Sequence, residues 1–158
     1  MSDAGRPGVP SKSTPPDWYA DGLRFECTQC GNCCTGPPGM VWFTPEEGRR
    51  IAERLGLGER EFLRRYARAI DGRLSLTERR TEHGMDCVFL DRESVPGKAV
   101  CSIYETRPTQ CRTWPFWPEN LGTPQTWAAV KRDTPCPGMG RGALVPIEAI
   151  RIQRDATE

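Results

Sequence analysis

The chain has 158 residues, a length that predicts one domain. Its formal net charge of +1 excludes strong bulk attraction to nucleic acid or to an anionic membrane, so neither is expected as a partner. Only 37% of the residues are apolar, and Gly and Pro are abundant, so the hydrophobic core should be small and should need a second source of stability.

The start of the chain predicts a tail and a cytoplasmic location. Residues 1–17 are rich in Pro, Gly and Ser and predict a disordered tail, whereas residues 18–154 predict the folded domain. The N-terminus has no apolar segment typical of a signal peptide, and no stretch approaches the ~20 apolar residues of a membrane helix. We therefore expect a cytoplasmic protein, in a compartment that keeps thiols reduced.

Strand and helix signals follow one another along the domain. Thr44-Pro45 with Glu47 three residues beyond the threonine predicts a capped helix start, because the side chains of Thr and Glu can bond each other's backbone N–H. Asp71-Gly72 is expected to end the helix that follows. We predict helices over 45–55, 59–70, from 107 to about 114 and over 146–154, and strands over 23–26, 40–43, 73–78, 87–90, 99–104 and 127–130.

These elements predict an α+β fold: a small, cysteine-rich, metal-organised domain with short antiparallel strands and three to four short helices. The strands over 87–90 and 99–104 should pair with each other, because residues 94–97 supply a turn between them.

Eight cysteines stand out, four of them within Cys27-Thr-Gln-Cys30-Gly-Asn-Cys33-Cys34. Thiols three residues apart on a tight turn can converge on one point, which is the geometry of a thiolate-bound metal. In a reducing compartment, metal ligation is favoured over the alternatives of disulfides, redox thiols or unrelated buried thiols. The candidate metal ligands are Cys27, Cys30, Cys33, Cys34, Cys87, Cys101, Cys111 and Cys136.

The adjacent cysteines Cys33 and Cys34 influence how the candidate ligands divide between metal sites. Neighbouring side chains diverge by about 100° in a helix and about 180° in a strand, so the two sulfurs are not expected to bind one tetrahedral ion together. One would then serve the site of Cys27 and Cys30, and the other would face a second site or the core. Two sites of four thiolates each are one arrangement that follows.

Both zinc and iron–sulfur clusters accept all-thiolate ligation. Structural zinc sites usually pair two C-x-x-C knuckles, whereas this chain has one such region and single distal cysteines. C-x-x-C-x-x-C with a remote Cys-Pro, here Cys136-Pro137, is similar to the way ferredoxin-like sites hold a cubane cluster. We therefore favour an iron–sulfur cluster of the 4Fe-4S type, with zinc as the alternative cofactor.

Residues near the last cysteines could surround such a centre. Trp114, Phe116 and Trp117 are either ordinary core or a hydrophobic wall that keeps water from the sulfurs. Arg107 and Arg112, on either side of a cysteine, either offset thiolate charge or form surface salt bridges.

Candidates for catalysis are few, and whether the protein is an enzyme stays open. His83 is the one histidine of the chain and is either a loop residue without function or an extra ligand or proton donor. Besides His83, only Glu105 and Arg107 can be named as groups that could act beside a metal. No catalytic residue is therefore assigned from the sequence.

Four segments combine cysteines with particular neighbours: Phe25-x-Cys27-x-x-Cys30-Gly31-x-Cys33-Cys34, Cys87-x-Phe89-Leu90, Cys101-x-Ile103-Tyr104-x-x-Arg107-Pro108-x-x-Cys111-Arg112 and Cys136-x-Gly138. Together they resemble the CxxCxxCC family, also called YkgJ-type, whose members are described as zinc- or iron-chelating. The resemblance implies metal binding in a small cysteine-rich α+β domain. A similar cysteine motif occurs in flagellin lysine methylases, although this chain has no recognisable S-adenosylmethionine motif.

The functional hypothesis is a metal-binding protein that holds an iron–sulfur cluster and acts in electron transfer, metal handling or as a subunit beside an unknown protein partner. Two alternatives remain: a structural zinc module for protein contacts, and a metal-dependent protein-modifying enzyme similar to flagellin lysine methylases.

Overall fold

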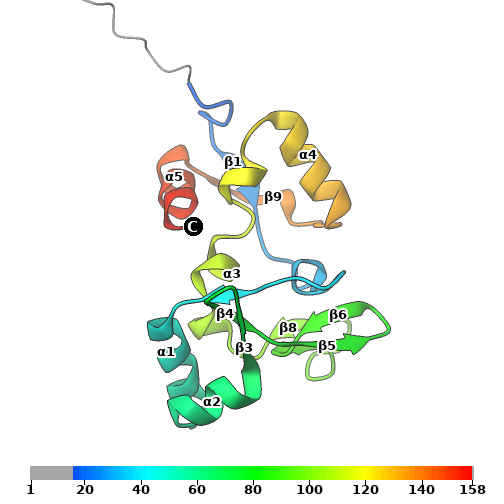
Figure 1. Ribbon diagram of the computed structural model, residues 1–158. Coiled ribbons are helices and arrows are strands. Elements are labelled where there is room, and N and C mark those ends of the chain that lie inside the picture. The colour runs from blue at the N-terminus through cyan, green and yellow to red at the C-terminus, as the bar shows by residue number, and fades with distance from the viewer. Residues whose placement is uncertain (1–15, 158) are drawn as a thin grey trace, which may run out of the picture.

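The computed structural model describes residues 16–157, which fold into two halves, each around its own group of buried apolar side chains (Figure 1). One half combines the two ends of the described chain, and the other is built from its middle. The predicted tail over residues 1–17 lies almost wholly outside the described residues.

The half made of the chain ends contains a two-stranded antiparallel sheet. Strand β1 (Leu23–Phe25) pairs with β9 (Met139–Val145), with a bulge between Arg24 and Phe25. Helices α4 (Pro124–Asp133) and α5 (Ile147–Ala156) complete this half. Its buried side chains are Tyr19, Phe116, Leu121 and Ile150.

The middle half has a three-stranded antiparallel sheet in the order β2-β4-β3, with two helices beside it. Its buried apolar side chains are Phe43, Ile51, Ala52, Phe62, Leu76, Phe89 and Ile103. The elements are β2 (Trp42–Phe43), α1 (Pro45–Leu55), α2 (Glu59–Tyr66), β3 (Ala67–Ile70) and β4 (Arg73–Leu76).

Two short antiparallel pairs extend this half. Strand β5 (Glu78–Thr81) pairs with β6 (Gly84–Cys87), and β7 (Leu90–Asp91) pairs with β8 (Val100–Cys101). The carboxylate of Asp86 in β6 is fully buried and accepts two hydrogen bonds from Arg92, at 2.7 and 3.0 Å. Helix α3 (Thr109–Thr113) lies between the two halves (Figure 1). The 3-10 helices are Asn32–Cys34, Tyr104–Thr106 and Pro118–Asn120.

The predicted start of α1 is confirmed at the level of single hydrogen bonds. Thr44 Oγ1 accepts from the Glu47 N–H at 3.2 Å, and Glu47 Oε2 accepts from the Thr44 N–H at 2.8 Å. Pro45 is the first helical residue, where no backbone donor is needed. The helix ends at Leu55, as predicted, before Gly56 in the left-handed conformation.

The strand predicted over 127–130 and the helix predicted over 67–70 are both wrong. Residues 127–130 were expected to be a strand but belong to α4, whose cap is Thr123 followed by Pro124, the same start signal as in α1. The helix predicted over 59–70 ends at Tyr66, and residues 67–70 form β3. Asp71 and Gly72, both with positive φ, form the turn of the β3–β4 hairpin instead of ending a helix.

The α+β prediction with short antiparallel strands is confirmed, with α4 as one helix more than predicted. Of the predicted pairing between 87–90 and 99–104, only the strand pair of Leu90 with Cys101 is found. Residues 88–89 form a turn, Cys87 belongs to β6, and Tyr104 begins a 3-10 helix. Among residues 16–157, no helix is both long enough and apolar enough to cross a membrane.

Candidate metal centre

The cysteine-rich segment packs closely against the segment that leads into β8. Gly31 has φ 76° and begins the 3-10 helix that carries Cys33 and Cys34. A Cβ at Gly31 would lie only 2.6 Å from the Cβ of Ala99, and the Ala99 N–H donates to the Gln29 carbonyl at 2.8 Å. Glycine is therefore needed here both for its conformation and for the close approach.

The turn that carries Cys136 lies against the same segment, although about a hundred residues separate them. Asn32 Nδ2 donates to the Pro135 carbonyl at 2.6 Å, and the Glu26 N–H donates to the Gly138 carbonyl at 3.2 Å. Pairing of β1 with β9 holds the two backbones in this position. The backbone thus brings the Cys136 turn beside the cysteine-rich segment, whereas the meeting of their sulfurs stays a prediction.

Gly138 makes this approach possible, which gives a testable prediction. A Cβ at this position would lie 1.8 Å from the backbone oxygen of Glu26, so Gly138→Ala must push the turn away from Glu26. We expect a loss of about 1–3 kcal/mol in unfolding free energy, measured by urea denaturation, and weaker metal retention. Gly122→Ala is the matched control because no atom lies within 4 Å of its Cβ position. Equal stabilities of the two variants would contradict the prediction.

Three further cysteines come from three different elements. Cys87 ends β6, Cys101 ends β8, and Cys111 lies in α3. Helix α3 is held by Glu47, whose Oε1 accepts from the N–H and the hydroxyl of Thr109 at 2.8 and 2.5 Å. Glu47 thus caps α1 and anchors the helix that bears Cys111. Its second role could not be read from the sequence.

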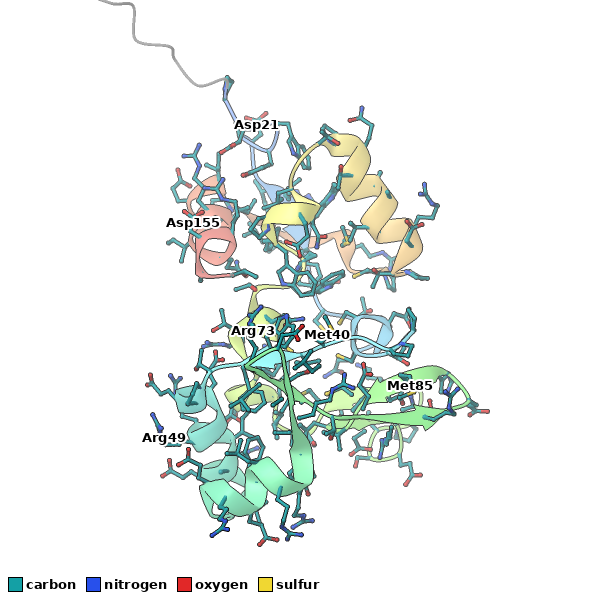
Figure 2. All side chains as sticks on the ribbon, viewed as in Figure 1. Asp21, Met40, Arg49, Arg73, Met85 and Asp155 are labelled. Atoms are coloured by element: carbon teal, nitrogen blue, oxygen red, sulfur yellow. The ribbon has the colours of Figure 1, made fainter. Side chains whose placement is uncertain are left out.

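A pocket of about 630 Å³ opens between the two halves and gathers most of the cysteines. Met40 lies close to the junction of the halves and Met85 on β6, and both line this pocket (Figure 2). Cys30 and Cys136 are not among the lining residues. The cysteines that line it are Cys27, Cys33, Cys34, Cys87, Cys101 and Cys111.

The thiols affect one another through space, as expected of groups that share a site. Burial raises the pKa of Cys111, and the neighbouring thiols of Cys87, Cys101 and Cys33 raise it further. Burial likewise raises the pKa of Cys87 to about 11, with Cys101 adding to the effect. Without a cation these thiols therefore stay protonated at neutral pH, and a bound metal would reverse that preference.

The expectation that Cys33 and Cys34 diverge is wrong. Their Sγ atoms lie 3.8 Å apart, although adjacent residues of a 3-10 helix differ by about 120° in direction. A tetrahedral ion with metal–sulfur bonds of about 2.3 Å places its sulfurs about 3.8 Å from each other. The two adjacent cysteines could therefore bind one ion together.

The arrangement fits a thiophilic metal in its chemistry but does not define the ligands. Within residues 16–157, no three or more His, Cys, Asp or Glu side chains stand in a group that could hold a metal ion. Six thiols, the ligands that a thiophilic metal prefers, nevertheless line one pocket. The buried indole N–H of Trp114, a hydrogen-bond donor and not a metal ligand, has no partner among the described residues. The assignment of all eight cysteines as ligands, and their division between sites, stays a prediction.

The five side chains predicted to surround the metal centre all line the cysteine pocket, but their other contacts differ. Trp114, Phe116 and Trp117 all line the cysteine pocket, which favours the hydrophobic wall. Arg112 lies 3.8 Å from the Glu47 carboxylate, so it serves the α1–α3 contact. The guanidinium of Arg107 stacks on Tyr104, at 3.7 Å from the ring centre. Its charge lowers the pKa of Cys33, less than the hydrogen bond from Cys34 does.

The other groups named for catalysis lie elsewhere. His83 is in the exposed turn between β5 and β6, with Nε2 3.5 Å from Glu82. Glu105 is exposed and lies 4.0 Å from Arg54. Neither lines the pocket, whereas Arg107 does. The geometry therefore gives little support to an acid–base role for His83 or Glu105.

Fold and site together define a small cysteine-rich α+β protein whose thiols gather at the junction of two halves. Residues 26–137 match the CxxCxxCC family, described as a putative zinc- or iron-chelating domain, and the chain belongs to this family. A comparison with curated proteins finds the "Uncharacterized protein MJ0661" of Methanocaldococcus jannaschii, 33% identical over 100 residues. The match covers 63% of this chain and 49% of the relative, so the chain spans about half of that protein's length. No solved structure matches.

Proposed function

We propose that this protein holds an iron–sulfur cluster through thiolates of the cysteine pocket and serves in electron transfer, in metal handling or as a subunit of a larger assembly. The observation that carries the proposal is the gathering of six cysteines from distant parts of the chain around one pocket. Membership of a zinc- or iron-chelating family supports it. The cytoplasm, where thiols stay reduced, is the compartment that suits such a centre.

One property of the pocket favours a cluster over one ion. Its volume of about 630 Å³ is far larger than one ion needs. The number of thiols does not decide, because a structural zinc ion and a 4Fe-4S cluster each take four thiolates. The aromatic side chains of Trp114, Phe116 and Trp117 would limit access of water to the sulfurs, which helps to set the redox properties of a cluster.

One specific observation favours zinc as the second candidate. The 3.8 Å between the sulfurs of Cys33 and Cys34 suits two ligands of the same tetrahedral ion. In this alternative the protein is a structural zinc module that contacts a protein partner. A metal-dependent modifying enzyme has less support, because His83 and Glu105 lie away from the pocket.

Metal analysis of anaerobically purified protein tests the proposal. Iron with acid-labile sulfide and a broad absorption near 400 nm are the expected result for a cluster. Colourless protein with bound zinc and no sulfide would favour the second candidate. A folded monomer that carries neither iron nor zinc would overturn both.

A further inference from the structure

Asn32 connects the segments of the two cysteines that do not line the pocket, Cys30 and Cys136. Its backbone N–H donates to Cys30 Sγ at 3.4 Å. Its side-chain Nδ2 donates to the carbonyl of Pro135, the residue before Cys136, at 2.6 Å. One residue therefore bonds both segments, although 103 positions separate Asn32 from Pro135.

A second contact joins the same two segments at their other end. The Glu26 N–H donates to the Gly138 carbonyl at 3.2 Å. Glu26 directly precedes Cys27, and Gly138 follows Cys136 by two residues. Cys27 and Cys30 thus lie between the two contacts on one segment, and Cys136 lies between them on the other.

The two contacts depend on the sequence in different ways. The contact between Glu26 and Gly138 joins backbone atoms, so the Glu26 side chain is not needed for it. The contact at Pro135 needs a side-chain N–H donor, which asparagine has and alanine lacks. Loss of the Asn32 amide would free one end of the Cys136 turn and leave the other end in place.

Residues that orient metal ligands affect metal affinity although they do not touch the metal. We propose that Asn32 is such a positioning residue: its side chain holds the Cys136 thiol beside Cys27 and Cys30, so that these three cysteines share one end of the metal centre. This inference rests on the proposed function. It gives Cys136 a defined place in the centre, although Cys136 does not line the pocket.

A double-mutant cycle tests the inference in the full chain, with Zn²⁺ as the probe because it binds thiolates. Zn²⁺ affinity is measured by competition with a chelator under reducing conditions. Asn32→Ala should weaken binding about 10–100-fold, as expected for a residue that orients a ligand. Cys136→Ser should weaken it at least as much. In the Cys136→Ser background, Asn32→Ala should cause no further loss, because the thiol through which Asn32 acts is gone.

Several outcomes would overturn this inference and leave the proposed function intact. Wild-type affinity in Asn32→Ala would show that the side chain does not position a ligand, whether or not the Cys136 variant folds. Wild-type affinity in Cys136→Ser would show that Cys136 is not a ligand. Equal weakening by Asn32→Ala in both backgrounds would show that Asn32 acts on the fold in general. A wild-type chain that binds neither Zn²⁺ nor iron would overturn the proposed function as well.

Arg24→Ala is the matched control. Arg24 Nη1 donates to the Gly142 carbonyl at 2.8 Å, so this side chain also joins β1 to β9, but away from the cysteines. Arg24→Ala should keep the wild-type affinity for Zn²⁺, and melting curves of both variants would compare their stabilities. If Arg24→Ala weakened Zn²⁺ binding as much as Asn32→Ala does, a specific role of Asn32 would be refuted.

Discussion

Removal of the metal should lower the melting temperature of this protein by about 20–40 °C. Thiolate sites contribute on the order of 10 kcal/mol, and each kcal/mol shifts the melting temperature of a chain of this size by roughly 2–4 °C. The structure offers little to replace that contribution. Its two groups of buried apolar side chains lie in separate halves, and the thiols lie between them.

The measurement is thermal melting followed by circular dichroism, before and after chelation under reducing conditions. Metal analysis must show complete removal, and addition of the original metal should restore the melting temperature. Hydrogen exchange would show which parts open first, and we expect the cysteine-rich segment and the Cys136 turn to be among them. Fully stripped protein that melts within a few degrees of the loaded protein would refute the idea that metal organises this fold.

Asp86→Ala should destabilise the protein by about 3 kcal/mol, or roughly 6–12 °C in melting temperature. The Asp86 side chain is fully buried, and its loss leaves the charge of Arg92 without a partner. We expect the lower end of the range for broken buried ion pairs, because the Arg92 side chain is 23% exposed and water can reach it. Asp86 also belongs to β6, which carries Cys87, so the site should weaken with it.

Asp133→Ala is the control for this ion pair. Asp133 bonds Arg132 at 3.1 Å on the surface, where both side chains are mostly exposed, so its loss should change stability by at most about 0.5 kcal/mol. The double variant Asp86→Ala with Arg92→Ala should recover part of the loss, because it removes the unpaired charge. Similar melting temperatures for Asp86→Ala and Asp133→Ala would show that the buried pair is not important.

The lowered pKa of the Asp86 carboxyl predicts that the stability of the protein depends on pH. Hydrogen bonding from Arg92, the largest cause, lowers the pKa of Asp86 to about 2. Because the folded value lies below the ordinary value of about 3.9, the contribution is complete above pH 4 and disappears as the pH falls to 2. Wild-type protein should lose roughly 2 kcal/mol more than Asp86→Ala across this range, measured by urea denaturation. Equal losses of unfolding free energy in the wild type and in Asp86→Ala would contradict the lowered pKa of Asp86.

Elements with local signals could be predicted, and α1 shows why. Thr44, Pro45 and Glu47 form a cap whose hydrogen bonds span three residues, so the local sequence contains the whole signal for the start of the helix. Thr123 and Pro124 carry part of the same signal, and weighing them against the apolar run 127–130 would have identified α4. Asp71-Gly72 was ambiguous, because the same pair suits a helix end and a hairpin turn, and only pairing of β3 with β4 decides between them.

The site depends on contacts that no local pattern contains. Spacing predicted that thiols would gather, but the 3.8 Å between the sulfurs of Cys33 and Cys34 depends on the directions of the two side chains, which spacing alone does not give. The second role of Glu47 exists only because α3 packs against the end of α1. The fit of Gly138 against Glu26 likewise joins residues that are neighbours only after β1 and β9 pair.

The β1–β9 pair can form only late during synthesis of the protein, because the ribosome makes β9 long after β1. After Cys27 the ribosome must add a further 108 residues before it adds Cys136, which takes roughly 5 to 20 s at ordinary rates of synthesis. During that interval the thiols of the cysteine-rich segment cannot contact Cys136, because Cys136 has not yet been synthesised. A chain that stops before β9 cannot form the β1–β9 pair, so the Cys136 turn would not be held beside the cysteine-rich segment.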